Sequence, residues 1–458
     1  MVLGGDRREG EARCRAVWKE VGWAERSEPH QSVAPGGARC ARPTLLREDG
    51  DRLGRSLALP TPLSANRTPL MTTNEDLIRA VHGSPTRLVL AIAGGGSRAI
   101  ADLLGVPGAS RTVLEAVVPY AESAMITLLG GRPDKSCAER TARALAMAAF
   151  CRGIDLLGGR SGLRDDAQEL VGIGCTASLA SDRSKRGAHR AHVAVQTPRQ
   201  TTCESIELSK GARSRDEEEA LVARMVLNAV AQACGVDLRL PLNLMSDERP
   251  TCRQVDAPPE WTDVLLGRRE TATLGAVPPP DASPALLSGS FDPLHEGHLR
   301  MAEVAAEVLG RPLAFEMSIA NVDKPPLDFV EIDHRCGQFD PAVVVWLSRA
   351  ATFLEKSRLF PGATFVIGAD TLSRIADPRY CPGGPSGHRQ TVEQIASRGC
   401  RFLVMGRLTG ERFASLAELE LPEYLRALCQ DVPQERFRVD ISSTDLRRAA
   451  GDIPPLSG

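Results

Sequence analysis

The spacing of apolar and polar positions becomes regular from about residue 72. An apolar run at 86–93 predicts a buried strand, and the glycines that follow it lead into a helical pattern at 98–104. Strands are also predicted at 113–120, 171–177 and 189–196, and helices at 74–82, 137–152 and 216–234. Strands that alternate with helices are typical of an α/β layered domain.

A second α/β pattern begins at residue 285. An apolar strand at 285–287 is followed by a Gly/Pro turn and by an amphipathic helix at 299–310 that ends in glycine. The same criteria predict strands at 313–319, 363–368, 401–406 and 437–440, and a helix at 342–355. We therefore expect a Rossmann-like domain with a parallel sheet, preceded by the first α/β domain.

Proline and irregular composition set the expected domain limits. Three consecutive prolines at 278–280 predict a stiff, extended spacer, so the boundary is placed in a Pro-rich linker at 241–284. Residues 1–70 mix basic and acidic side chains without periodicity, unlike a signal or transit peptide. We expect them to be disordered, or to be a non-native extension with the true start at Met71. The two domains are then 71–240 and 285–458.

The composition narrows the class of protein. The 458 residues include 56 basic and 58 acidic side chains, which excludes a strongly basic footprint for nucleic acid. No apolar run is long enough to span a bilayer. The 12 cysteines form no C-x-x-C pair, so we expect neither a zinc site nor a disulfide framework. These features favour a cytoplasmic protein with no nucleic-acid or membrane partner and no metal site of its own.

The turn after the strand at 285–287 concentrates the chemistry. His295 and His298 fall three residues apart at the start of the next helix, on one helix face. The free N–H groups and positive dipole end of a helix N-terminus attract phosphate, and Gly297 lets a nucleotide approach the backbone. This arrangement suits the charge that develops on phosphorus during substitution. The alternative is a capped surface helix without a site.

Residues 289–298, Gly-Ser-Phe-Asp-Pro-Leu-His-Glu-Gly-His, resemble the signature of the HxGH nucleotidyltransferase superfamily, G-(S/T)-F-D-P-x-H-x-G-H. Residues 441–447, Ile-Ser-Ser-Thr-Asp-Leu-Arg, resemble its second signature, I-S-S-T-x-(I/L)-R. The resemblance implies that His295 and His298 stabilise the phosphates and the developing charge. It implies nucleotide-binding roles for Gly289, Ser290, Phe291, Asp292, Gly297, Ser442, Ser443 and Thr444.

Further site residues are expected just after predicted strands. Lys324 follows the strand at 313–319, where the resembling transferases place a lysine that contacts phosphates; a surface lysine is the alternative. Gly368 and Asp370 belong to a Gly-Ala-Asp run that resembles the segment beside the ATP ribose and base in nicotinate- and nicotinamide-nucleotide adenylyltransferases. The other role open to Asp370 is a helix N-cap. Arg447, one helical turn beyond the second-signature hydroxyls, is expected to bind the triphosphate.

The resemblance implies adenylyl transfer from ATP, with Mg²⁺, to nicotinamide mononucleotide or its deamido form, with release of pyrophosphate. This step belongs to NAD biosynthesis. No nucleophile is arranged beside a base, so direct in-line attack by the acceptor phosphate is expected. Two alternatives stay open. One is another transferase of the superfamily, such as a cytidylyltransferase or a pantetheine-phosphate adenylyltransferase; the other is a nucleotide-binding sensor with little turnover. The oligomeric state, including a homo-oligomer, is also open.

The domain at 71–240 resembles the C-terminal domain of the CinA family, whose active members deamidate nicotinamide mononucleotide. The resemblance rests on residues 103–110, 117–120 and 171–177, on Gly187 and on the strand at 189–196. Ala93 stands where the family has its serine nucleophile, and Met125 stands where it has a lysine, although the family's tyrosine is kept as Tyr120. An alanine offers no hydroxyl to attack an amide. We expect a binding or scaffolding module; an amidase that uses another residue is the alternative.

Overall fold

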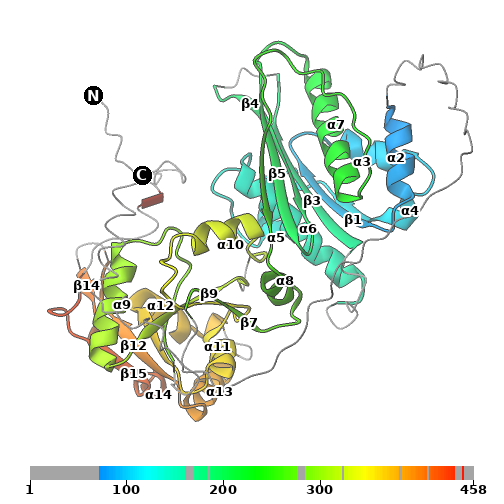
Figure 1. The fold of residues 1–458 in the computed structure, drawn as a ribbon. Helices are drawn as coiled ribbons and strands as arrows, with labels where there is room; N and C mark the ends of the chain where they lie inside the picture. Colours follow the sequence, from blue (N-terminus) through cyan, green and yellow to red (C-terminus); the bar gives the residue numbers. More distant parts are fainter. Residues whose placement is uncertain are drawn as a thin grey trace, which may run out of the picture.

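The computed structural model describes residues 72–159, 169–182, 186–276, 284–321, 324–380, 384–409, 412–438 and 446–447. Figure 1 shows two lobes, each built around its own β-sheet, with α10 (Phe329–Cys336) at their junction. Residues 1–71 lie outside the described residues. The structure therefore does not test the expectation that residues 1–70 are disordered or non-native. No helix in the described part of the chain is both long and apolar enough to cross a membrane.

The N-terminal lobe contains a mixed sheet, six-stranded in the described residues, with the order β2-β1-β3-β4-β5-β6. Strand β1 (Arg87–Ala93) pairs in parallel with β2 (Val113–Val117) and β3 (Leu170–Ser178). The remaining strands run antiparallel to their neighbours. They are β4 (His189–Gln196), β5 (Gln200–Leu208) and β6 (Thr251–Asp256).

Helices cover both faces of this sheet. Along β1, Leu88, Leu90 and Ile92 pack with α2 (Asn74–His82), α3 (Arg98–Gly105) and α7 (Arg215–Ala233). Val89 and Ala91 point to the opposite face and pack with α6 (Glu139–Leu156), as the two-residue period of a strand requires. Two short helices complete the lobe: α4 (Ala109–Thr112) and α5 (Glu122–Leu129).

Two glycines of β3 let α6 lie against the sheet. A Cβ at Gly172 would fall 2.1 Å from the carbonyl oxygen of Ala146, and one at Gly174 would fall 2.1 Å from that of Ala142. Real Cβ atoms do not approach backbone so closely, so any larger residue would push the helix away. These glycines therefore set the position of α6.

The C-terminal lobe holds a sheet, seven-stranded in the described residues, with the order β15-β12-β11-β8-β9-β10-β7. All neighbouring pairs are parallel except the edge pair of β10 and β7. The strands are β7 (Thr271–Leu274), β8 (Ala285–Ser288), β9 (Leu313–Ser318), β10 (Val345–Ser348), β11 (Thr364–Gly368), β12 (Arg401–Met405) and β15 (Cys429–Val432). The chain goes from β8 toward β9 and later returns to the other side at β11. The C-terminal end of β8 is therefore a topological switch point, where open α/β sheets bind ligands.

The other elements of this lobe are mostly helices. They are α8 (Pro259–Leu266), α9 (Glu296–Leu309), α11 (Phe353–Leu359), α12 (Ala369–Ala376), α13 (Gly384–Ser397) and α14 (Glu423–Arg426), with the hairpin β13 (Arg407–Thr409) and β14 (Arg412–Ala414). The α/β class expected for both domains is confirmed.

The predicted linker contains three regular elements. Strand β6 adds to the N-terminal sheet, β7 adds to the C-terminal sheet, and α8 between them buries Trp261. Pro259 did not break a helix because it stands at the first helical position, where proline loses no hydrogen bond. The prediction of a linker does not hold for these elements. The triple proline at 278–280, where the stiff spacer is expected, lies outside the described residues.

Three other predicted elements also differ. The helix expected at 342–355 is a strand, β10, followed by the start of α11, because the apolar run before residue 348 is buried between two neighbouring strands. The strand expected at 113–120 stops at Val117. Phe437 and Arg438 lie outside any strand, and the rest of the strand predicted at 437–440 is outside the described residues.

The two lobes share buried contacts. Met147 and Phe150 of α6 belong to the same apolar cluster as Trp261 of α8 and Phe329 of α10. The backbone N–H of Phe329 donates to Thr201 Oγ1 of β5 at 3.0 Å. The lobes therefore pack through a continuous core at their junction.

Candidate active site

The turn between β8 and α9 is built around a buried aromatic ring. Phe291 is fully buried and adopts a φ of 46°, in the left-handed region. Its ring meets those of His298, Phe315 and Phe339 edge-on, at centroid distances of 5.1, 5.5 and 5.3 Å. A Cβ at Gly289 would lie 2.7 Å from this ring, so glycine is needed there. Phe291 and Gly289, both predicted site residues, thus determine the conformation of the turn by their packing.

The two histidines meet at the N-terminus of α9. His295 is the N-cap residue, and its ring stacks on that of His298 with centroids 3.9 Å apart and planes 26° apart. The backbone N–H of His295 donates to Nδ1 of His298 at 3.3 Å. This bond requires a lone pair on Nδ1, so a neutral His298 carries its proton on Nε2. The helix start thus combines two imidazoles with a dipole end that favours anions.

Asp292 lies at the centre of a cluster of ion pairs. Its Oδ2 is 2.6 Å from Arg140, 3.3 Å from Arg335 and 3.3 Å from Arg447. Burial alone would raise the pKa of this carboxyl, but Arg335 and Arg140 outweigh it and lower the pKa below its usual range. Asp292 therefore stays ionised and holds three guanidiniums around the signature turn.

Arg447 joins the two signatures. One of its Nη atoms donates to the carbonyl oxygen of Asp292 at 2.5 Å and lies 3.3 Å from the Asp292 carboxylate. Among the described residues, no group accepts a hydrogen bond from the buried Nε of Arg447. Ser442, Ser443 and Thr444 lie outside the described residues. Arg447 of the second signature therefore contacts Asp292 of the first.

The segment around α10 holds the turn from the other side. Arg335 Nη1 donates to the carbonyl oxygen of Ser290 at 2.8 Å. Gln338 Nε2 donates to the carbonyl oxygen of Phe291 at 3.0 Å, and Gln338 Oε1 accepts from the N–H of Leu294 at 2.8 Å. These side chains satisfy backbone groups that no regular element could pair, and so fix the turn.

Lys324 and Asp370 belong to the same edge of the sheet. Lys324 follows β9, and Asp370 is in the first turn of α12, directly after β11; both strands are neighbours of β8. Gly368 is the N-cap residue of α12, and Asp370 is the second residue of the helix, so Asp370 does not occupy the N-cap position. A Cβ at Gly368 would lie 2.8 Å from Asp370 Oδ1, so this glycine makes room for the carboxylate.

Three residues that hold the turn were missed from the sequence: Arg140, Arg335 and Gln338. Arg140 lies on α6 of the other lobe, 152 positions before Asp292, so no local pattern pointed to it. Arg335 and Gln338 follow the Lys324 loop in a segment for which no element was predicted. The sequence signal that could have revealed this helix is the amphipathic stretch at 329–336, preceded by Asp328 as its N-cap.

The described residues contain no group of three or more potential metal-ligating side chains close together. The Asp292 carboxylate, in the turn before the histidines, is held by arginines.

The glycine-rich turn between β1 and α3 is bound by the carboxylate of Glu219. Glu219 of α7 accepts hydrogen bonds from the backbone N–H of Gly96 at 2.9 Å and of Arg98 at 3.3 Å, and from Ser97 Oγ at 3.1 Å. A phosphate would have to displace this side chain. Ala93, at the expected nucleophile position, is buried. The turn is therefore capped from within the lobe.

Two histidines of the N-terminal sheet have side-chain partners within the lobe. His189 Nδ1 lies 2.7 Å from buried Glu218, and His192 Nδ1 lies 2.7 Å from Ser205 Oγ. Burial lowers the pKa of His192 to about 4, so this ring is neutral near pH 7. Both rings are thus held by contacts within this lobe.

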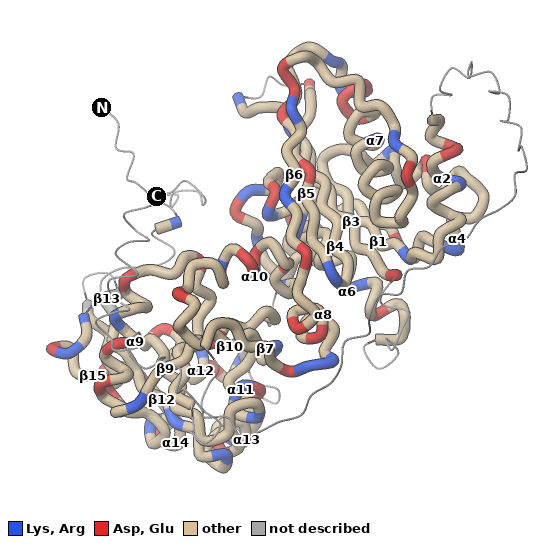
Figure 2. Tube along the Cα trace, in the orientation of Figure 1, with Lys and Arg blue, Asp and Glu red and all other residues tan. Residues whose placement is uncertain are grey.

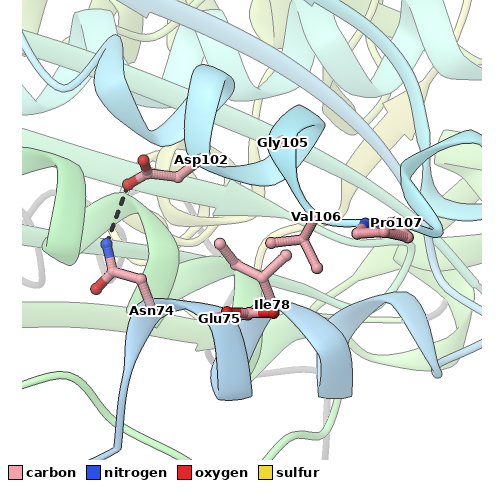
Figure 3. Close-up of a pocket in the computed structure, with 7 residues that line it drawn as sticks. All are labelled: Asn74, Glu75, Ile78, Asp102, Gly105, Val106 and Pro107. Atoms are coloured by element: carbon pink, nitrogen blue, oxygen red, sulfur yellow. Dashed lines mark hydrogen bonds between the residues drawn. The ribbon is translucent and has the colours of Figure 1, made fainter.

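A shallow pocket of about 260 Å³ lies between α2 and α3, away from the histidines (Figure 3). At its end, Asn74 Nδ2 donates to Asp102 Oδ2 at 3.1 Å, while Ile78 and Val106 form its apolar side. It contains none of the predicted site residues. Figure 2 shows acidic and basic residues interspersed along the described chain, in keeping with the balanced composition.

The cytidylyltransferase-like family model matches residues 286–449, which contain both signatures. Residues 286–449 form a cytidylyltransferase-like domain. Nucleotidyl transfer in general is thereby supported for the C-terminal lobe. No curated protein matches the chain.

Solved structures similar to the chain include CinA-family proteins. The competence/damage inducible protein CihA from Agrobacterium tumefaciens is 16% identical, with a TM-score of 0.29, over 36% of this chain and 99% of that protein. A CinA superfamily protein from Escherichia coli is 17% identical, with a TM-score of 0.27, over 37% of this chain and 98% of that protein. Likenesses of this size assign no activity.

Proposed function

We propose that the cytidylyltransferase-like domain transfers an adenylyl group from ATP to a pyridine mononucleotide and releases pyrophosphate. The acceptor is nicotinamide mononucleotide or its deamido form, so the product is NAD or deamido-NAD. The observation that carries the proposal is the stacked pair His295 and His298 at the start of α9, joined to Arg447 of the second signature through Asp292. The Gly-Ala-Asp run at 368–370 supports the pyridine-nucleotide acceptor by resemblance.

The reaction is an in-line substitution at the α-phosphorus of ATP. The acceptor's phosphate oxygen forms the new P–O bond, and the bond to the β-phosphate oxygen breaks, so that pyrophosphate leaves with the electron pair. The chain supplies positioning and charge and forms no covalent intermediate. The Nε2–H of His298 and the N-terminus of α9 are suited to stabilise charge that builds on phosphate oxygens.

The cations have divided roles in this proposal. Arg447, fixed by Asp292, binds the triphosphate, and Lys324, beyond the end of β9, reaches the same edge of the sheet. Asp370 accepts hydrogen bonds from the ribose or the base. Ser442, Ser443 and Thr444 orient the triphosphate, and Mg²⁺ enters bound to ATP.

The deciding experiment is pyrophosphate release by purified protein with ATP and Mg²⁺, tried with each pyridine mononucleotide and with pantetheine phosphate. A parallel series uses CTP, because a cytidylyltransferase is the second candidate and the family match does not select the base. Turnover with ATP and a pyridine mononucleotide that is lost in His298→Ala supports the proposal. Turnover with CTP, or with pantetheine phosphate alone, selects another transferase; ATP binding without turnover selects a nucleotide sensor.

A further inference from the structure

The N-terminal lobe reaches the transferase site through α6. Arg140, in the first turn of this helix, places one Nη atom 2.6 Å from Asp292 Oδ2 and 2.9 Å from Glu331 Oε1 of α10. Asp292 is part of the HxGH signature. A residue of one lobe therefore contacts the catalytic turn of the other.

Arg140 makes the shortest of the three guanidinium contacts to the Asp292 carboxylate. The other two come from Arg335 and Arg447, each at 3.3 Å. Arg335 is itself paired to Glu331 at 2.8 Å, so Arg140 and Arg335 share both carboxylates. The orientation of Asp292 is thus set from two sides, and Arg447 is held by an acceptor that Arg140 helps to fix.

A neighbouring arginine of the same helix, Arg143, is far more buried than Arg140. Arg143 is 5% exposed and lies 2.5 Å from Asp328, which is 7% exposed, so this pair is a buried clamp between the lobes. The Arg140 side chain is 43% exposed. Its partners Asp292 and Glu331 are 15% and 9% exposed. Because the Arg140 end of these pairs is open to solvent, loss of Arg140 should destabilise the protein less than loss of the Arg143 clamp.

A second contact from the N-terminal lobe borders the site independently. Gly131, between α5 and α6, lies beside the predicted phosphate-binding lysine: a Cβ at Gly131 would be 3.1 Å from Cε of Lys324. The same stretch of the N-terminal lobe therefore contacts both Lys324 and Asp292.

We propose that the N-terminal lobe completes the transferase site, and that Arg140 is the positioning residue through which it acts. Arg140 fixes Asp292, and Asp292 in turn presents Arg447 to the triphosphate. This inference rests on the proposed function, because it assigns Arg447 to the nucleotide.

The test compares Arg140→Ala and Arg140→Lys with Arg152→Ala in the full-length chain. Arg152 is a matched control on the same helix: its side chain is 49% exposed, and it pairs with Glu115 inside the N-terminal lobe. The measurements are kcat and KM for ATP, ATP affinity by calorimetry without acceptor, and the thermal unfolding midpoint. Guanidinium chloride at low millimolar concentration is then added to Arg140→Ala.

The expected result is a drop of about tenfold in kcat/KM for Arg140→Ala, with weaker ATP binding and an unfolding midpoint close to that of Arg152→Ala. Arg140→Lys retains part of the activity, and added guanidinium restores part of the activity of Arg140→Ala. Wild-type kinetics in Arg140→Ala would overturn the inference. A loss of activity that follows a lowered unfolding midpoint, with no response to guanidinium, would also overturn it, because Arg140 would then be structural.

Failure of the proposed function gives a different pattern. If the wild type binds ATP but releases no pyrophosphate with any acceptor, the proposed reaction is wrong. ATP affinity then decides the inference: weaker binding by Arg140→Ala supports it, and equal binding overturns it. If the wild type neither binds ATP nor turns over, both proposals are wrong.

Discussion

At the scale of single residues, the site depends on Asp292 remaining ionised. Its carboxylate faces Arg140, Arg335 and Arg447, and their combined charge overcomes the effect of burial on its pKa. A substitution that removes the negative charge of Asp292 but keeps the shape of its side chain therefore tests this cluster of ion pairs directly.

We predict that Asp292→Asn lowers kcat by roughly 100-fold, because Arg447 loses its anchor. Because the folded-state pKa of Asp292 is depressed, its stabilising effect is complete above the ordinary carboxyl value of 3.8 and is lost as the pH falls through the lower folded value. The difference in unfolding free energy between wild type and variant should therefore shrink below about pH 4. Steady-state kinetics and urea unfolding at several pH values measure the two effects. An unchanged kcat would contradict the assignment.

A second prediction at this scale concerns amide hydrolysis. Ala93 cannot act as a nucleophile, and Ser97 donates to Glu219, which already accepts from two backbone N–H groups. We expect no ammonia release from nicotinamide mononucleotide above a protein-free blank. Release that disappears in Ser97→Ala would show that the N-terminal lobe is an amidase after all.

At the scale of elements, the sequence predicted the helices and strands whose buried positions follow the regular period of a helix or a strand. β1 is buried along its whole apolar run, and α9 follows a signature whose turn residues are diagnostic. β6 was missed because it is mostly exposed and polar, so no alternation marks it. The sequence pattern predicts a helix where β10 lies, because an apolar run buried on both faces has no period that distinguishes a strand from a helix. Contacts between lobes, such as that of Arg140, depend on the packed structure and carry no local signal.

The approach of α6 to β3 gives a prediction for an element. Gly172→Ala should destabilise the protein by about 1–3 kcal/mol, because the added methyl group would overlap the backbone of α6. Gly187→Ala is the control, since a Cβ there has no neighbour within 4 Å. Denaturant unfolding of both variants measures the difference. Equal stability would mean that α6 does not lie as close to the sheet as described.

The buried pair of Glu248 and Arg213 gives a pH-dependent prediction. Arg213 Nη1 lies 2.5 Å from Glu248 Oε1, and the backbone N–H groups of Met245 and Ser209 also donate to this carboxylate. The hydrogen bond from Arg213, which outweighs burial, lowers the pKa of Glu248 to about 2. Glu248→Gln should therefore cost roughly 3 kcal/mol near pH 7.

This contribution is complete above the ordinary value of 4.5 and falls away as the pH approaches 2. Unfolding free energies of wild type and Glu248→Gln across that range check the trend, with the exposed Glu207→Gln as control. A difference that does not change with pH would contradict the assigned ion pair.

At the scale of the whole molecule, two α/β lobes meet along α6, α8 and α10, and the predicted transferase turn lies beside that junction. The sequence predicted both lobes and the position of the signature histidines. It could not predict that the lobes share a core, because the stretch between them resembled a linker. In the proposed account, the N-terminal lobe supports the chemistry of its neighbour through Arg140.

The most direct test of the central claim is pyrophosphate release from ATP and Mg²⁺ by the purified full-length protein, with and without a pyridine mononucleotide. We predict release that requires the mononucleotide and yields the corresponding dinucleotide, and that is abolished by His298→Ala. Release that proceeds equally without the acceptor, or that persists in His298→Ala, would contradict it.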